Sequence, residues 1–176
     1  MATVSKFANA NAVVVTGYTN PTDGYTDDGV YATAAPAKNS TVSSDYGFPA
    51  FATGDIPDGS TINSVTAEIQ FKVSVTTSIA TQGLQLNNNG TLLGTRQDDT
   101  TEPAADTLLT HQVTTGVTLA DLRNANFVLA RVSAIRGNSS TAVTLSLDYV
   151  KLTVDYTPSV FPLHPYRREL GVLLLR

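Results

Sequence analysis

The chain has 176 residues, 15% of them charged, and a formal net charge of -4 at pH 7. This length is most simply one domain with its own core, and the low charge implies a surface of mostly Thr, Ser, Asn and Gln that favours association. The absence of cysteine excludes a disulfide framework, a thiolate zinc site and a cysteine nucleophile. The acidic balance argues against nucleic acid as a partner. No run approaches the roughly 18 apolar residues of a membrane span, so we expect no membrane partner.

The beginning of the chain, "MATVSKFANANAVVV", lacks the basic start and long apolar run of a secretory signal, and its residues 1–8 precede the first strand pattern. We therefore expect the chain to fold where it is made, and we treat this segment as an N-terminal arm. Weak strand patterns follow at residues 12–18, 30–37 and 45–52. We assign residues 9–157 to one β domain.

The loop "NPTDGYTDDGVYA" places three carboxylates close together in the sequence, at Asp23, Asp27 and Asp28. Calcium prefers several oxygen ligands on a bent loop, so these residues are weak calcium candidates. Their spacing does not meet the EF-hand pattern, and Asp-Gly pairs are ordinary turn formers. We expect no metal and no cofactor.

The clearest periodicity is "STINSVTAEIQFKVSVTT", in which apolar and polar residues alternate from Val65 to Val75. Period two over this length predicts one long strand with its apolar face inward. The Asn89-Gly90 dipeptide between two short apolar runs predicts a β-hairpin, because it accepts the positive φ angles of a type I′ turn.

The C-terminal half continues the β pattern. Thr118 and Asp121 have capping-box spacing, which predicts a short helical turn before a strand at 127–135. In "TAVTLSLDYVKLTVDYT" the alternation changes phase, so we expect a bulge, bend or turn near Asp148 and Tyr149. Many short strands and little helical pattern predict an all-β, antiparallel β-sandwich, most simply a jelly roll.

The sequence shows little that could carry catalysis. Its histidines are His111, in a predicted strand, and His164, and it has no serine-hydrolase, metalloprotease or phosphate-binding motif. Glycoside hydrolysis needs two facing carboxylates. The candidates lie in "RQDDTTEPAAD", which reads as an exposed acidic loop: Asp98, Asp99, Glu102 and Asp106. We therefore predict that the chain is not an enzyme.

Three stretches together resemble a β-sandwich domain of bacteriophage and prophage structural proteins, over about residues 9–157. They combine an Asn-Pro opening, an Asp-Gly-x-Tyr-Ala run, an Ile-Pro-x-Gly-x-x-Ile turn and a closing Asp-Tyr-Val. The matching positions are Asn20, Pro21, Asp28, Gly29, Tyr31, Ala32, Ile56, Pro57, Gly59, Ile62, Asp148, Tyr149 and Val150. The resemblance implies a non-enzymatic virion component, made in the host cytoplasm. The chain lacks the tryptophan of that pattern's hairpin region.

The tail, residues 158–176, ends in "PYRRELGVLLLR". Its prolines at 158, 162 and 165 disfavour regular structure and suggest an extended strap. An apolar cluster beside two arginines suits docking on a partner protein or folding back on the same sandwich, and we favour the partner. The residues expected to bind it are Tyr166, Arg167, Arg168, Leu170, Val172, Leu173, Leu174 and Leu175.

Two functional hypotheses follow. The first is a capsid decoration or head-tail junction protein that assembles with other virion proteins and with copies of itself. The alternative is a receptor- or glycan-binding domain of a tail fibre. The absence of tryptophan weakens, without excluding, a glycan-binding face built on large aromatic platforms.

Overall fold

The computed structural model describes residues 1–9 and 17–159, which form two packed antiparallel sheets. The strands of sheet A are β1 (Ala2–Phe7), β2 (Ala32–Ala34), β4 (Thr61–Val73), β8 (Thr107–Val113) and β10 (Leu145–Thr157). Those of sheet B are β3 (Ser40–Gly47), β5 (Ala80–Asn88), β6 (Thr91–Leu92), β7 (Gln97–Asp99) and β9 (Val128–Arg136). The predicted all-β sandwich is confirmed.

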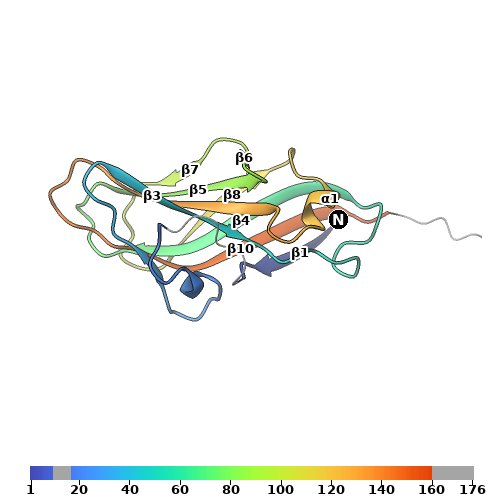
Figure 1. Cartoon of the computed structure of the whole chain (residues 1–176), viewed down its shortest axis with the longest axis horizontal. Coiled ribbons are helices and arrows are strands. Elements are labelled where there is room, and N and C mark those ends of the chain that lie inside the picture. Colours follow the sequence, from blue (N-terminus) through green and yellow to red (C-terminus); the bar gives the residue numbers. More distant parts are fainter. Residues whose placement is uncertain (10–16, 160–176) are drawn as a thin grey trace, which may run out of the picture.

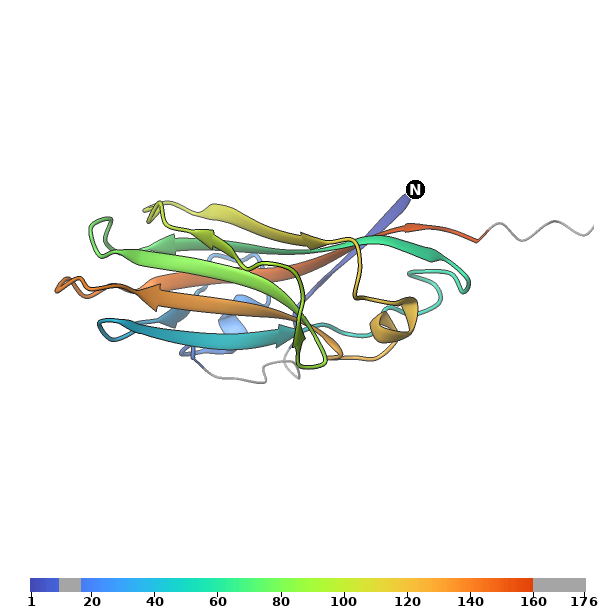
Figure 2. The same cartoon turned by 90° about the horizontal axis from the view of Figure 1, so that it is seen from above.

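The strand order is that of a jelly roll. Sheet A runs β1–β10–β4–β8, with β2 also paired to β10, and sheet B runs β3–β9–β5–β6, with β7 also paired to β5. The strands follow the long axis of the molecule, so their connections gather at its two ends (Figures 1 and 2). We call the end that holds the β2–β3, β4–β5, β7–β8 and β9–β10 connections the loop end. The helix α1 (Leu119–Leu122) lies at the other end (Figure 1).

The core lies between the sheets and is built by strands that alternate as the sequence predicts. In β4, Ile69 and Phe71 are completely buried, and in β10 so are Leu147 and Leu152. The pairing register of these two strands shifts between Leu147 and Tyr149, which confirms the predicted irregularity. The extra residue, Asp148, moves the apolar residues that follow it back to the core face.

Other local predictions are also confirmed. At the start of α1, the Thr118 hydroxyl accepts from the Asp121 N–H at 3.2 Å, and the Asp121 carboxylate accepts from the Thr118 N–H at 2.8 Å. The turn between β5 and β6 holds Asn89 at φ 47° and Gly90 at φ 93°, as a type I′ turn requires. No helix among residues 1–9 and 17–159 is long and apolar enough to span a bilayer.

Two assignments differ from the sequence reading. Residues 2–7 of the predicted N-terminal arm form β1, which pairs with β10 along its whole length. This strand is short and carries few apolar residues, so its alternation is weak. The strand predicted at 45–52 instead covers residues 40–47, because four of the five residues from 40 to 44 are serine or threonine and hide its start. Of the strand predicted at 12–18, residues 12–16 lie outside the described residues.

His111 in β8 is buried and points between the sheets, where a polar strand histidine was predicted. Its Nδ1 accepts a hydrogen bond from the Leu86 N–H at 3.2 Å, and its Nε2 lies 3.1 Å from the Thr95 carbonyl oxygen. The ring is therefore a neutral tautomer with its proton on Nε2. Burial lowers the pKa of His111.

We expect acidification to destabilise the protein through His111. A folded-state pKa below the unfolded value, about 6.5, means that the unfolded chain binds more protons, so stability falls as the pH drops through that value. The variant His111→Asn can still accept from Leu86 but does not titrate. Its melting temperature should fall less than that of the wild type between about pH 8 and about pH 5.

An equal fall in melting temperature in the wild type and in His111→Asn would contradict this prediction. Burial raises the pKa of the Asp148 carboxyl, whose effect on stability has the opposite sign. The paired comparison is needed because it isolates the imidazole from such carboxyls.

Candidate functional site

The outer face of sheet A carries a group of aromatic and charged side chains that contact one another. Three successive outward positions of β4 are Glu68, Gln70 and Lys72. The bulge at Asp148 directs Tyr149 to the same face, opposite Gln70. This surface is flat rather than enclosed, because it is one side of an antiparallel sheet.

The first group of side chains, which we call the Tyr149 cluster, consists of Phe7, Glu68, Tyr149 and Lys151. The Tyr149 hydroxyl donates to the Glu68 carboxylate at 2.8 Å, and Lys151 forms an ion pair with the same carboxylate. The Phe7 ring packs edge-on to Tyr149 with centroids 5.5 Å apart, and it stays 41% exposed. Burial, together with Glu68, raises the pKa of Tyr149, so its hydroxyl remains a donor.

The second group, the Tyr31 cluster, consists of Tyr31, Lys72 and Asp106. The Tyr31 hydroxyl donates to Asp106 at 2.9 Å, and the Lys72 ammonium nitrogen lies 3.6 Å from the other oxygen of that carboxylate. The ammonium also sits over the Tyr31 ring, 3.7 Å from its centroid, within the range of a cation–π interaction. Each charge of this cluster is thus paired, and the ring is held in place.

Gln70 lies between the two clusters on β4. Its Oε1 is buried and has no hydrogen-bond partner among the residues that the structure describes. The neighbouring outward residues of the strand, Glu68 and Lys72, are both engaged in ion pairs. Gln70 is therefore a polar group that the described residues leave unpaired on a face whose other polar groups are largely satisfied.

This arrangement suits binding rather than bond cleavage. Paired charges leave the face nearly neutral, partly exposed rings offer apolar surface, and fixed polar groups offer directional hydrogen bonds. Glu68 and Asp106 each already accept from a tyrosine and pair with a lysine. Neither is set up as the free general acid or base that a glycosidase needs.

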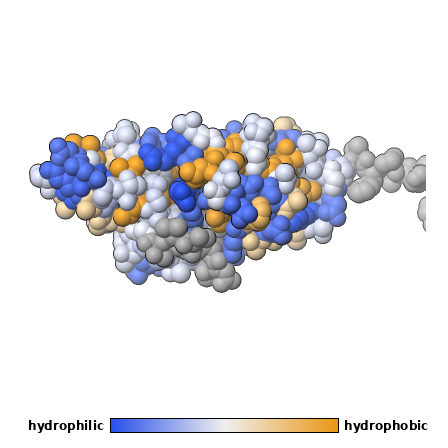
Figure 3. Space-filling model, turned by 45° about the horizontal axis from the view of Figure 1, so that its top comes forward, coloured by the Kyte–Doolittle hydropathy of each residue, from blue (hydrophilic) through white to orange (hydrophobic). Residues whose placement is uncertain are grey.

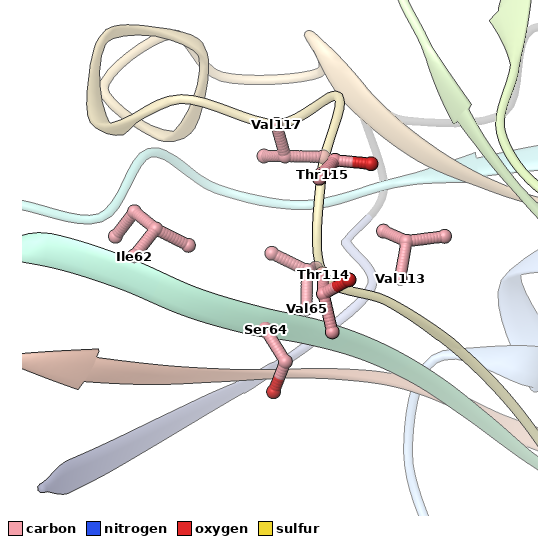
Figure 4. Close-up of a pocket in the computed structure, with 7 residues that line it drawn as sticks. All are labelled: Ile62, Ser64, Val65, Val113, Thr114, Thr115 and Val117. Carbon is pink, nitrogen blue, oxygen red and sulfur yellow. The ribbon is translucent and has the colours of Figure 1, made fainter.

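A small hollow lies near α1, where β8 leaves sheet A (Figure 4). Its cavity volume is about 0 Å³, so it is a shallow surface dimple and not a small-molecule site. Its lining is largely aliphatic and hydroxylated: Ile62, Ser64, Val65, Val113, Thr114, Thr115 and Val117. On the face drawn in Figure 3, apolar residues lie among polar ones rather than in one large patch.

The calcium candidates do not form a ligand set. The two oxygens of Asp28 accept from the Val30 N–H and the Thr26 hydroxyl, so this carboxylate organises its own loop. Asp23 lies in the short 3-10 helix η1 (Pro21–Gly24). Within residues 1–9 and 17–159, no three or more His, Asp or Glu side chains are placed to hold a metal ion.

The acidic candidates of the 96–106 segment have separate partners. Asp98 forms a bidentate pair with Arg96, and Asp99 accepts from Thr101. The prediction of an exposed loop is wrong for Glu102, which is buried and accepts hydrogen bonds from Ser78 and Ala80. It is also wrong for residues 97–99, which form β7.

Two of the motifs behind the resemblance to phage structural domains, Asp-Gly-x-Tyr-Ala and Asp-Tyr-Val, meet in space. The Gly29 N–H donates to the Asp148 carboxylate at 3.1 Å, and Tyr25 forms an isolated bridge with Tyr149. These contacts hold the 25–31 loop beside β10, so the motif residues that make them have a structural role in this fold. The predicted partner-binding residues of the tail, from Tyr166 to Leu175, lie outside the described residues.

Sequence reasoning missed the two clusters. The outward positions Glu68, Gln70 and Lys72 were visible in the alternation of β4, and they were the available signal. Nothing local linked them to Phe7 or Asp106, which other strands and loops bring to the face.

No protein-family model and no curated protein matches the chain. Among solved structures, it is similar to a family two carbohydrate esterase from Cellvibrio japonicus, with 14% identity and a TM-score of 0.39 over 92% of this chain. The chain spans 37% of that esterase. It is also similar to the N-terminal cellulose-binding domain of Cellulomonas fimi β-1,4-glucanase C, with 19% identity, a TM-score of 0.44, and coverage of 87% of this chain and 93% of the domain.

A third similar structure is TmCBM61 in complex with β-1,4-galactotriose. It shows 8% identity and a TM-score of 0.35, with 85% of this chain and 86% of that chain covered. Similarities this distant do not identify a ligand for this chain. The sandwich fold follows from the strand pairing described above.

Proposed function

We propose that this chain is a non-catalytic recognition domain that binds a glycan across the outer face of sheet A. The observation that carries the proposal is the placement of two partly exposed rings at the two ends of the polar row along β4, with Phe7 at the level of Glu68 and Tyr31 against Lys72. The C–H faces of sugar rings pack on aromatic rings, while sugar hydroxyls bond to fixed polar side chains. An open face also admits a long polymer, which an enclosed pocket does not.

The binding residues are held in position before a ligand arrives. Tyr149 supports Phe7 through an edge-on ring contact, and Lys72 and Asp106 fix Tyr31. A ligand therefore needs to order few side chains, which reduces the entropic cost of binding. Soluble neutral β-1,4-glycans are the natural first probes, because their flat, hydroxyl-rich chains fit such a surface.

The proposal is tested by measuring the affinity of the wild type for an array of soluble oligosaccharides, followed by Phe7→Ala and Tyr31→Ala. Each variant should bind about ten-fold more weakly or worse, a loss of about 1.4 kcal/mol that one ring contact can supply. The matched control is Leu92→Ala in β6, which removes an apolar side chain of similar exposure, 43%, from sheet B. Its affinity should be unchanged.

Failure of the wild type to bind any glycan on the array would overturn the proposal. So would an equal loss of affinity in Leu92→Ala, because the effect would then not belong to the outer face of sheet A.

A second candidate is assembly with other protein chains, as the resemblance to virion domains implies. The observation that favours it is the exposure of Val30 and Leu108, each more than half accessible to solvent. Exposed apolar side chains on a weakly charged surface favour association. Light scattering of the wild type and of Leu108→Ser tests this candidate, which predicts oligomers that the substitution weakens. A location in a phage virion, with virion proteins as partners, stays a prediction.

A further inference from the structure

Gln70 is distinguished from the residues around it by its unused hydrogen-bonding capacity. It lies at the centre of the face, opposite Tyr149 on β10 and Leu108 on β8. Its buried Oε1 accepts no hydrogen bond in the part of the chain that the structure describes. An unpaired buried acceptor destabilises a fold, so a residue of this kind calls for an explanation.

None of the donors in the described residues bonds to the Oε1 of Gln70. The Tyr149 hydroxyl and the Lys151 ammonium are directed to Glu68, and the Lys72 ammonium is directed to Asp106. The two clusters thus hold their own polar groups and leave the amide between them. Because its oxygen makes no hydrogen bond, turning the amide toward a ligand breaks none.

The chemistry of the position defines what it can recognise. An amide offers an acceptor oxygen and a donor N–H₂ group, and a hydroxyl group can serve both. A ligand carboxylate only accepts, so it would leave the Oε1 of Gln70 without a donor. It would also gain no net attraction from Lys72 and Lys151, because Asp106 and Glu68 already pair with them.

We propose that Gln70 determines the specificity of the face, by pairing its amide with hydroxyl groups of a neutral glycan and so favouring neutral over acidic chains. The inference rests on the proposed function, since it assigns a ligand class to the same surface. It also implies that Gln70 is retained for binding although it lowers the stability of the fold. Stability therefore gives a second measurement of the inference, one that needs no ligand.

The experiment compares Gln70→Leu with the wild type in two measurements. The first is the affinity for a panel of neutral β-1,4-linked oligosaccharides that includes manno-oligosaccharides, and for β-1,4-linked oligomannuronates as acidic counterparts. The second is the melting temperature of the free protein. Gln70→Leu should bind the neutral glycans at least about ten-fold more weakly, yet melt at the same or a higher temperature, because it removes an unpaired acceptor.

Gln112→Leu is the matched control. Gln112 is an outward glutamine of β8 on the same face, but its Nε2 donates to the hydroxyls of Ser64 and Thr66 at 3.2 and 3.1 Å. This variant should melt at a lower temperature and keep the wild-type affinity. Gln70→Glu keeps the shape of the side chain but replaces the N–H₂ donor with a second acceptor oxygen, so it should also lose affinity for the neutral glycans.

The outcomes separate the two proposals. If the wild type binds neutral glycans and Phe7→Ala weakens binding, but Gln70→Leu binds normally, the role of Gln70 is overturned while the proposed function stands. A lower melting temperature of Gln70→Leu would assign the residue to structure and overturn its role as well. Tighter binding of the acidic oligosaccharides would overturn the ligand class. Failure of the wild type to bind any glycan would overturn both proposals.

Discussion

Replacing Glu102 by alanine should lower the free energy of unfolding by about 3–5 kcal/mol, the sum expected when several buried donors lose one acceptor. Its Oε1 accepts from the Ser78 N–H at 3.1 Å, the Ser78 hydroxyl at 2.7 Å and the Ala80 N–H at 2.6 Å. The side chain is buried, with Glu102 only 8% exposed, so water cannot replace it freely. Chemical denaturation of the wild type and the variant measures the loss.

The strained turn that Glu102 holds supplies a control of opposite sign. Between the two bonded residues, Ile79 has φ 53°, a left-handed conformation that is unfavourable for a β-branched side chain. Ile79→Gly should therefore stabilise the protein by about 0.5–1 kcal/mol. A loss below about 1 kcal/mol in Glu102→Ala would contradict the account, because even one orphaned buried donor costs that much.

The second large effect is expected on the outer face of sheet B. Arg131 donates from Nε and Nη2 to the two oxygens of Asp45, at 2.7 and 2.6 Å. The Asp45 side chain is 3% exposed, whereas that of Arg131 is 34% exposed. Removing Arg131 leaves a buried carboxylate uncompensated, so Arg131→Ala should cost about 3–5 kcal/mol.

Replacing the other partner, Asp45, should lower the free energy of unfolding by less. In Asp45→Ala the guanidinium remains near the surface and can be hydrated, so we expect a loss of about 1–3 kcal/mol. The double variant Asp45→Val with Arg131→Met should recover most of the stability, because apolar replacement of a buried pair is often neutral. Denaturation of the wild type, the two single variants and the combined variant Asp45→Ala with Arg131→Ala forms a double-mutant cycle. If the two single variants lost equal free energy of unfolding, the difference in burial between Asp45 and Arg131 would not determine the cost of removing each partner.

Local signals in the sequence were sufficient for much of the fold. The alternation around Phe71 specifies β4, the phase change at Asp148 specifies the bulge, and Thr118 with Asp121 specifies the start of α1. Each signal lies within a few residues of the structure that it predicts. The weak strand at Ala2–Phe7 is different, because its partner is β10 at the other end of the chain.

The candidate site could be predicted only in part. The outward row of β4 is visible in the alternation, but its functional neighbours are not. The hydrogen bond from Tyr31 to Asp106 joins residues 75 positions apart, and both lie beside strands rather than in the row itself. The burial of Glu102 likewise depends on a turn 22 to 24 residues earlier. Pairings of this kind are decided by the whole fold, not by the segment that carries the residue.

The antiparallel pairing of β1 with β10 has a practical consequence. Ala2 lies opposite Tyr156, so the described chain enters and leaves the sandwich at adjacent points, away from the loop end (Figure 1). Tethering to a bead, a sensor chip or a host polypeptide through either terminus would fix the molecule by the same pole. The loop end would then point away from the support. The outer faces of both sheets would stay accessible along the sides of the molecule.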